Sequence, residues 1–195
     1  MRASRDPAAV QAALDELRRV ARTDENVMEA TLAAAPPPTE DQADLRDEVA
    51  RVGEALGRTL KILVGKPGLD GHSNGAEQIA VRARDVGMEV VYEGIRLTPA
   101  QIARSAVDEG VHVIGLSILS GSHRELIPDV IDALKEAGGE DIPVVCGGII
   151  PEADVAPLKK AGVAAVYTPK DFDLSQIMRD IVTLVEERHG VAAGA

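Results

Sequence analysis

The chain has 195 residues, which is long enough for one well-packed domain with an appendage. Its formal net charge of -11 at pH 7, without a local cluster of lysines and arginines, disfavours nucleic acid and membrane surfaces as partners. Cys146 is the only cysteine, which excludes an internal disulfide framework. With no apolar stretch of signal-peptide or membrane-spanning length, the sequence predicts a soluble, cytoplasmic protein.

Residues 1–57 predict a helical docking and linker segment. Apolar residues at helical spacing indicate an amphipathic helix over 7–22, and a shorter helical piece is expected near 25–34. Three prolines at 36–38 should form a stiff extended spacer, because no helix continues through them. A capping-box sequence after the prolines predicts a second helix over 40–56, which leads into the main domain.

Residues 58–188 predict an α/β domain with a doubly wound, five-stranded parallel sheet. Short runs rich in valine and isoleucine alternate with amphipathic segments that are long enough to be crossover helices. The flavodoxin-like strand order 2-1-3-4-5 suits such a chain and places a ligand at the carboxyl ends of the first and third strands. The expected strands lie near 60–65, 88–91, 111–117, 142–146 and 163–167, the expected helices near 75–86, 99–109, 123–137, 151–161 and 173–188, and a flexible tail at 189–195.

The loop after the first strand is the first indication of a ligand site. It runs from Gly65 to Gly75 and contains four glycines, yet it matches neither the dinucleotide pattern nor the P-loop pattern. Asp70 and His72 lie two residues apart in it, so the carboxylate could orient the imidazole while the other ring nitrogen faces a metal. Taken alone, this pair also fits a turn with a surface histidine.

The third and fourth strands end in small and hydroxyl-bearing residues. Ser117 and Leu119 mark the end of the third strand, and Gly147 and Gly148 mark the end of the fourth. Each pattern alone is typical of an ordinary turn. Because the carboxyl ends of parallel strands share one sheet edge, all three loops together indicate a long slot beside the possible metal ligand.

These motifs resemble those of the cobalamin-binding domains found in acyl-CoA mutases, glutamate mutase and methionine synthase. The family patterns D-x-H-x-x-G, S-x-L and G-G all occur here, in that order and at matching strand ends. The matching positions are Asp70, His72, Gly75, Ser117, Leu119, Gly147 and Gly148. The resemblance covers about residues 58–188 and implies that this domain binds cobalamin.

The resemblance implies roles for the loop and for the slot. His72 would be the lower axial ligand of cobalt, in place of the cofactor's own dimethylbenzimidazole, and Asp70 would orient it. The displaced nucleotide tail would enter the slot, where Ser117 would hydrogen-bond the base and Leu119 would pack on it. The remaining expected cofactor-binding positions are Gly71, Gly75, Gly147, Gly148, Tyr167 and Thr168.

Three further segments look like the C-terminal domain of acyl-CoA mutases, most closely that of ethylmalonyl-CoA mutase. They are residues 71–79, 92–99 and 167–172. The likeness implies adenosylcobalamin as the cofactor and radical carbon-skeleton isomerisation, with ethylmalonyl-CoA or methylmalonyl-CoA as the substrate. No segment supplies a substrate barrel, so we expect no catalytic residue in this chain and no activity without a barrel-bearing mutase subunit or domain that holds the acyl-CoA.

The fold and the slot allow two other interpretations. A response-regulator receiver needs a phosphate-accepting aspartate at the end of its third strand, where this chain has Ser117. A cobalamin-binding carrier or sensory module without mutase activity remains open. Outside the motifs, His123 could border the corrin but is expected, like His112, to be structural, and Cys146 is expected to be a small buried filler.

Overall fold

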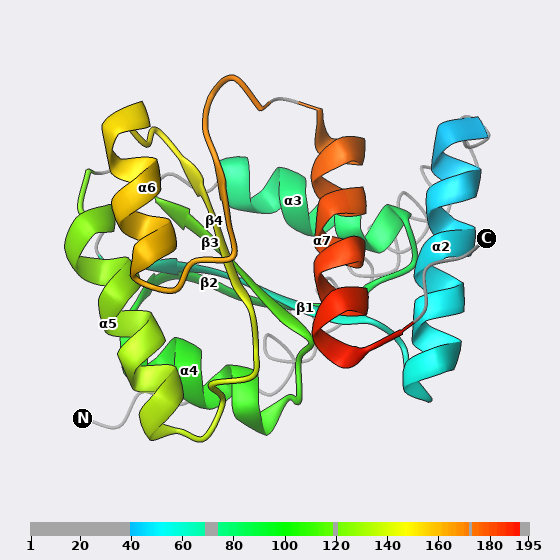
Figure 1. Cartoon of the computed structure of the whole chain (residues 1–195), viewed down its shortest axis with the longest axis horizontal. Coiled ribbons are helices and arrows are strands. Elements are labelled where there is room, and N and C mark those ends of the chain that lie inside the picture. Colours follow the sequence, from blue (N-terminus) through cyan, green and yellow to red (C-terminus); the bar gives the residue numbers. More distant parts are fainter. Residues whose placement is uncertain (1–39, 69–73, 119–120, 172, 192–195) are drawn as a thin grey trace, which may run out of the picture. The chain divides into compact units, whose positions relative to one another are not determined.

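The computed structural model describes residues 40–68, 74–118, 121–171 and 173–191. In chain order its elements are α2 (Glu40–Leu56), β1 (Lys61–Pro67), α3 (Asn74–Asp85), β2 (Glu89–Leu97), α4 (Pro99–Asp108), β3 (Val113–Ile118), α5 (His123–Glu136), β4 (Val144–Gly148), α6 (Glu152–Lys160), β5 (Ala165–Tyr167) and α7 (Leu174–His189). The strands form one parallel sheet in the order β2-β1-β3-β4-β5 (Figure 1), which confirms the predicted doubly wound, flavodoxin-like fold. The helices predicted over 7–22 and 25–34 and the spacer at 36–38 lie outside the described residues.

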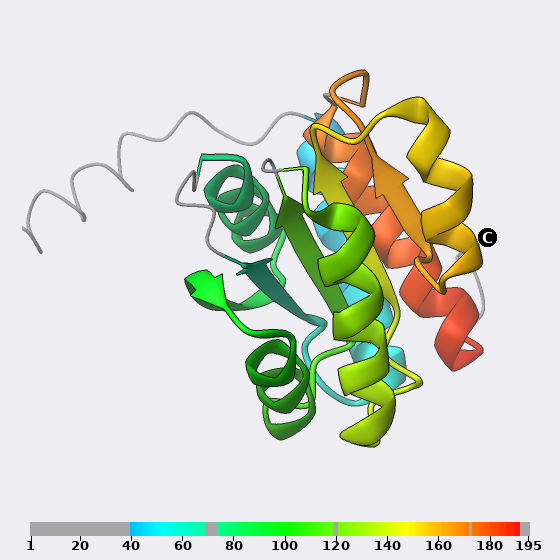
Figure 2. The ribbon, with the colours of Figure 1, turned by 90° about the vertical axis from the view of Figure 1, so that its left-hand side faces the viewer.

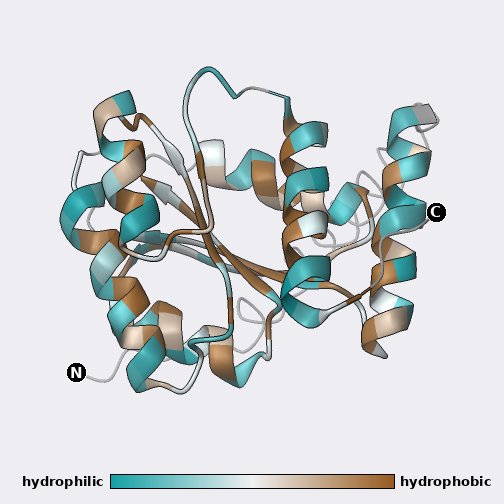
Figure 3. Ribbon diagram, viewed as in Figure 1, coloured by the Kyte–Doolittle hydropathy of each residue, from teal (hydrophilic) through white to brown (hydrophobic). Residues whose placement is uncertain are grey.

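The sheet separates two clusters of buried apolar side chains, one on each face. In β1, Ile62 and Val64 belong to one cluster and Leu63 to the other, as the two-residue period of a strand requires. Helices α2, α3 and α7 contribute to the first cluster, and α4, α5 and α6 to the second (Figure 1, Figure 2). Figure 3 shows helices of mixed hydropathy, which fits helices that bury one side only. Within the described ranges, no helix combines the length and the apolar character needed to cross a membrane.

The helix predicted over 40–56 is present as α2 and packs against α7. Its apolar stripe of Leu45, Val49 and Val52 is buried in the same cluster as the inner face of α7. Charged side chains also join the two helices, through the pairs Arg179–Asp41, Arg179–Glu48 and Arg51–Glu186. Helix α2 therefore completes the core on this face of the sheet.

Strand β2 is longer than the sequence pattern indicated. A strand was expected near 88–91, but β2 continues to Leu97. Its second half is irregular, because Gly94 has φ = 82°, Arg96 has φ = 64°, and the register with β1 shifts there. The extension lies beside the exit of β1, where the Gly68 N–H donates to the Leu97 carbonyl across 2.9 Å. A partly exposed edge strand with a bulge lacks the clean apolar alternation that identifies strands in a sequence.

Candidate ligand-binding cleft

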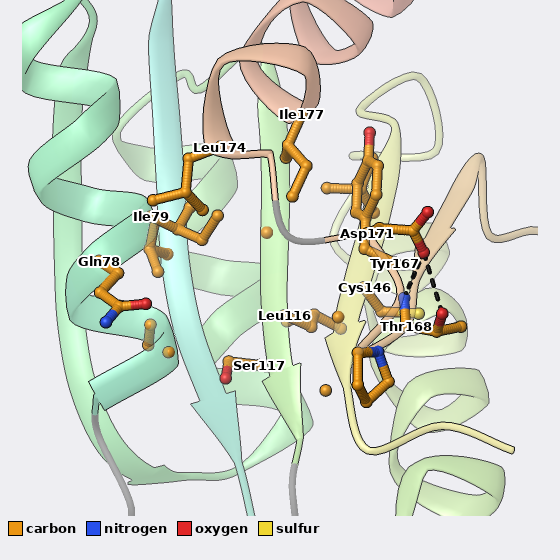
Figure 4. Close-up of a pocket in the computed structure, with 18 of the residues that line it drawn as sticks. Gln78, Ile79, Leu116, Ser117, Cys146, Tyr167, Thr168, Asp171, Leu174 and Ile177 are labelled. Atoms are coloured by element: carbon orange, nitrogen blue, oxygen red, sulfur yellow. Dashed lines mark hydrogen bonds between the residues drawn. The ribbon is translucent and has the colours of Figure 1, made fainter.

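A cleft of about 360 Å³ lies between the sheet and helices α3 and α7 (Figure 4). Strands β1, β3 and β4 form its floor, and the turn after β5 closes one side. The first crossover leads from β1 outward to β2, whereas β3, β4 and β5 extend the sheet on the other side of β1. The cleft thus lies at the point where the strand order reverses, which is where open α/β sheets bind ligands.

Six of the ten predicted site residues line this cleft. Gly75 comes from the first turn of α3, Ser117 from β3, and Tyr167 and Thr168 from the end of β5. The glycine pair at the end of β4 completes the set of Gly75, Ser117, Gly147, Gly148, Tyr167 and Thr168. The other four predicted residues, Asp70, Gly71, His72 and Leu119, lie outside the described residues.

Gly75 and Gly147 could each carry a side chain without a backbone clash. The space that they leave in the cleft is therefore not needed by the fold itself. A Cβ atom at Gly75 would lie 3.6 Å from Ser117 Oγ, and one at Gly147 would lie 3.6 Å from Tyr167 Cβ. Both are ordinary van der Waals distances, and neither glycine has a positive φ. Ser117 lies close to the start of α3 (Figure 4). Glycine at these two positions thus lets a ligand approach the backbone more closely than any side chain would allow.

Gly148 is glycine for a different reason. Its φ is 147°, and an added Cβ would lie 1.8 Å from the carbonyl oxygen of Ile118 at the end of β3. The fold itself therefore requires glycine at this position, whether or not the cleft holds a ligand. In sequence the two residues of the G-G motif look equivalent, and only the backbone separates their roles.

Helix α7 supplies an apolar wall that the sequence motifs did not reveal. Leu174, Ile177 and Ile181 line the cleft at helical spacing, with Ile79 of α3 opposite (Figure 4). In the sequence, this stripe has the pattern of a helix that packs on a sheet, and most of α7 does so. The sequence pattern does not show which residues of this stripe also line the cleft.

The polar side chains that line the cleft are few, and two of them are hydrogen-bonded to each other. Asp171 Oδ2 accepts hydrogen bonds from Thr168 N, at 2.7 Å, and from Thr168 Oγ1, at 3.0 Å (Figure 4). Among the described lining residues, Asp171 is the only charged one. The ligand portion that suits this cleft is therefore uncharged and largely apolar.

Tyr167 and Cys146 both remain protonated beside the cleft. Burial, with the nearby carboxylates of Asp180 and Asp171, raises the pKa of Tyr167, whose hydroxyl makes no hydrogen bond to the described residues. Burial raises the pKa of the Cys146 thiol to about 12, and its side chain is 1% exposed. The thiolate form is thus suppressed, which agrees with the expectation of a small buried filler.

Lys66 is a buried lysine that belongs to none of the three sequence motifs. It is fully buried at the end of β1, and its Nζ donates to the Ser117 carbonyl across 3.4 Å. It thereby joins the end of β1 to the end of β3. No cluster of three or more histidine, cysteine, aspartate or glutamate side chains able to hold a metal occurs in the described part of the chain.

Comparison with known proteins agrees with this site. The model of the B12-binding domain matches residues 60–171, so the chain belongs to the family of B12-binding domains. This confirms the family resemblance seen in the motifs and makes the domain a cobalamin-binding one.

Two curated relatives are acyl-CoA mutases. The chain is 53% identical to ethylmalonyl-CoA mutase of Cereibacter sphaeroides, over 95% of this chain and 33% of that protein. It is 36% identical to methylmalonyl-CoA mutase of Escherichia coli, over 97% of this chain and 32% of that protein. The chain thus spans about a third of the length of these relatives.

Solved structures share the fold at low sequence identity. A cobalamin-binding protein from Desulfitobacterium hafniense superposes with a TM-score of 0.54 at 20% identity, covering 75% of this chain and 70% of that chain. The monomethylamine corrinoid protein of Methanosarcina barkeri superposes with a TM-score of 0.55 at 13% identity, covering 73% of this chain and 63% of that chain. At these identities the likeness supports the flavodoxin-like fold alone.

Proposed function

We propose that this chain holds adenosylcobalamin for an acyl-CoA mutase reaction, with ethylmalonyl-CoA or methylmalonyl-CoA as the substrate. The observation that carries the proposal is the largely apolar cleft at the strand-order reversal, where Gly75 and Gly147 leave room that the fold does not require. The 53% identity to an ethylmalonyl-CoA mutase supports the same reaction.

The residues of the cleft suit the nucleotide tail of the cofactor. Its aromatic base would lie in the cleft beside Gly75 and Gly147, with the Ser117 hydroxyl as its hydrogen-bonding partner. The apolar wall formed by Leu174 and Ile177 would cover the face of the base. Burying about 100 Å² of apolar ring surface there would contribute about 2.5 kcal/mol to binding.

On the cobalt side, we assign His72 as the lower axial ligand and Asp70 as the carboxylate that fixes the orientation of its ring. These assignments rest on the D-x-H-x-x-G motif, because both residues lie outside the described part of the chain. When bound, adenosylcobalamin would supply the radical chemistry through its cobalt–carbon bond. The chain itself binds and orients the cofactor and shields its tail from water.

The acyl-CoA would be held by a barrel-bearing subunit or domain, because the described elements form only the cofactor domain. The helix predicted over 7–22 would contribute to docking with that partner. We also propose that the protein is cytoplasmic. Its single cysteine is buried and cannot form a disulfide within the chain, so folding needs no oxidising compartment.

The test has two stages. Titration of the purified chain with cobalamin should give saturable binding and the spectrum of a histidine-ligated cobalt. The chain alone should then show no turnover of ethylmalonyl-CoA or methylmalonyl-CoA, and turnover should appear when a barrel-bearing mutase subunit is added. Cobalamin binding without turnover with any such partner would point instead to a carrier or sensory module.

A deletion tests the docking role of the N-terminal segment. A chain that lacks residues 1–34 should keep its cobalamin affinity and lose affinity for the barrel subunit. Unchanged partner affinity would remove the docking role and leave the cofactor assignment intact.

A further inference from the structure

A buried charged cluster joins the first turns of α5 and α6, outside the cleft. His123 Nε2 donates to Asp154 Oδ2 across 2.8 Å. Arg124 donates to Asp154 Oδ1 through Nη2 at 2.6 Å and through Nε at 3.0 Å. The side chains of His123 and Asp154 are almost fully buried, whereas that of Arg124 is 67% exposed.

The protonation states of this cluster follow from its hydrogen bonds. The guanidinium of Arg124 and the ring of His123 lower the pKa of Asp154, so the carboxylate stays ionised and can only accept. His123 Nε2 must therefore carry a hydrogen. Because Asp154 lies in the first turn of α6, the positive end of that helix also favours the charge.

Burying charged groups in this way is weak evidence for stability, because desolvation offsets most of the attraction between them. The hydrogen bonds do fix the relative position of the three side chains, because Asp154 Oδ2 is bonded to His123 and Asp154 Oδ1 to Arg124. The cluster thus fixes the position of the segments that it joins.

The cluster joins the amino end of α5 to that of α6, next to the connection that follows β4. This connection, residues 149–151, leads from Gly148 to α6, and its Ile149 lines the cleft. At its start, Gly148 lies against the backbone of Ile118 at the end of β3. At its far end, Asp154 in the first turn of α6 is held by His123 and Arg124 of α5.

We propose that His123, Arg124 and Asp154 are positioning residues that fix the connection between β4 and α6 and thereby the part of the cobalamin cleft that this connection forms. None of the three lines the cleft, so they act through Ile149. Without the cluster, the ligand would have to order this connection when it binds, which lowers affinity. The inference rests on the proposed function only in taking cobalamin as the ligand.

The test compares cobalamin affinity with stability in the full chain. His123→Ala should weaken cobalamin binding about 5- to 20-fold at a temperature at which it is folded. His123→Gln, whose amide nitrogen replaces Nε2 as the donor, should bind within about twofold of wild type. A residue that only stabilises the fold would lower the melting temperature without changing the affinity of the folded chain.

His112 provides the matched control. It is another buried histidine with one hydrogen-bond partner, the Lys61 N–H, and it lies at the opposite, amino end of the sheet. His112→Ala should therefore lower stability while leaving cobalamin affinity unchanged. A loss of affinity in His112→Ala equal to that in His123→Ala would overturn the inference.

Arg124→Ala keeps the inference testable if His123→Ala fails to fold. Its exposed side chain can be removed without leaving a core cavity, and the loss of both donors should weaken cobalamin binding about two- to fivefold. If Arg124→Ala binds cobalamin as tightly as the wild-type chain, the inference is wrong. If the wild-type chain itself binds no cobalamin, the proposed function is wrong as well.

Discussion

His112 Nδ1 accepts a hydrogen bond from the backbone N–H of Lys61 across 2.9 Å, at the amino end of the sheet. The ring is 2% exposed, and Nε2 makes no hydrogen bond to the described residues. Burial, with the positive charge of Arg58 nearby, lowers the pKa of His112 to about 4. The folded protein thus holds this histidine in its neutral form, as expected of a structural residue.

This arrangement predicts acid sensitivity in a defined range. The pKa of His112 is lower in the folded chain than the ordinary value of 6.5, so the unfolded chain binds more protons between these values. The contribution of His112 to stability should therefore be largest above pH 6.5 and should fall as the pH drops toward about 4. The loss should be at most about 3 kcal/mol, and screening by solvent makes it smaller.

The measurement is urea unfolding at several pH values. His112→Asn offers a carbonyl oxygen to the Lys61 N–H but cannot be protonated, so its stability should vary less with pH than that of wild type. Because carboxylates contribute equally to both proteins, the difference between the two curves isolates His112. Parallel curves would show that another group controls the acid response.

Gly75→Val should separate ligand binding from folding. The new side chain would occupy the space beside Ser117 that is assigned to the nucleotide tail, with no backbone conflict. Stability should change by less than about 1 kcal/mol, while cobalamin affinity should fall at least about tenfold. Urea unfolding measures the stability and calorimetric titration the affinity, and wild-type affinity in the folded variant would mean that the tail passes elsewhere.

Gly148→Ala should have the opposite effect. A Cβ 1.8 Å from the Ile118 carbonyl oxygen, at φ = 147°, forces the ends of β3 and β4 apart. We expect a loss of at least about 2 kcal/mol of stability, or failure to fold, even without cofactor. Thermal unfolding of the cofactor-free chain is the measurement, and a stable Gly148→Ala variant would contradict the backbone geometry.

Arg96→Asn should stabilise the chain. Among the described non-glycine residues, only Arg96 has a positive φ, and asparagine tolerates this region better. The expected gain is about 0.5 kcal/mol in urea unfolding. Arg84→Asn in α3 is the control, because asparagine has a lower helix propensity than arginine and should reduce stability slightly. A loss of cobalamin affinity in Arg96→Asn would show that the strained backbone serves the site.

The axial ligand can be tested directly by spectroscopy. His72→Ala should abolish the spectrum of histidine-ligated cobalt. Asp70→Ala should retain it in part and weaken cobalamin binding by about 10- to 100-fold, as loss of a carboxylate that orients a ligating imidazole commonly does. Identical spectra in wild type and His72→Ala would refute the assignment.

The sequence predicted the parts of the fold that follow from local patterns. Runs of valine and isoleucine identified all five strands apart from the second half of β2, and the capping box formed by Thr39 and Gln42 identified α2. Motifs also identified Gly75, Ser117 and Gly147, which are small or hydroxyl-bearing residues at strand ends, where parallel sheets bind ligands.

The remaining features depend on contacts between distant segments. His123 and Asp154 are 31 positions apart and belong to no motif, so only the packed helices reveal their pairing. The backbone contact between Gly148 and Ile118 likewise crosses from one strand to the next. Leu174 and Ile177 follow an ordinary amphipathic pattern, and their place in the cleft depends on where α7 settles on the sheet.

The shape of β2 also bears on how the open sheet avoids pairing with other chains. An edge strand exposes unpaired N–H and C=O groups that can recruit a further strand, which is a common start of aggregation. On one edge of this sheet, the positive φ of Gly94 and of Arg96 breaks the regular spacing of those groups. On the other edge, β5 is only three residues long. Neither edge offers a long, straight template. The irregularity that made the second half of β2 unrecognisable in the sequence thus also protects the folded sheet from pairing with other chains.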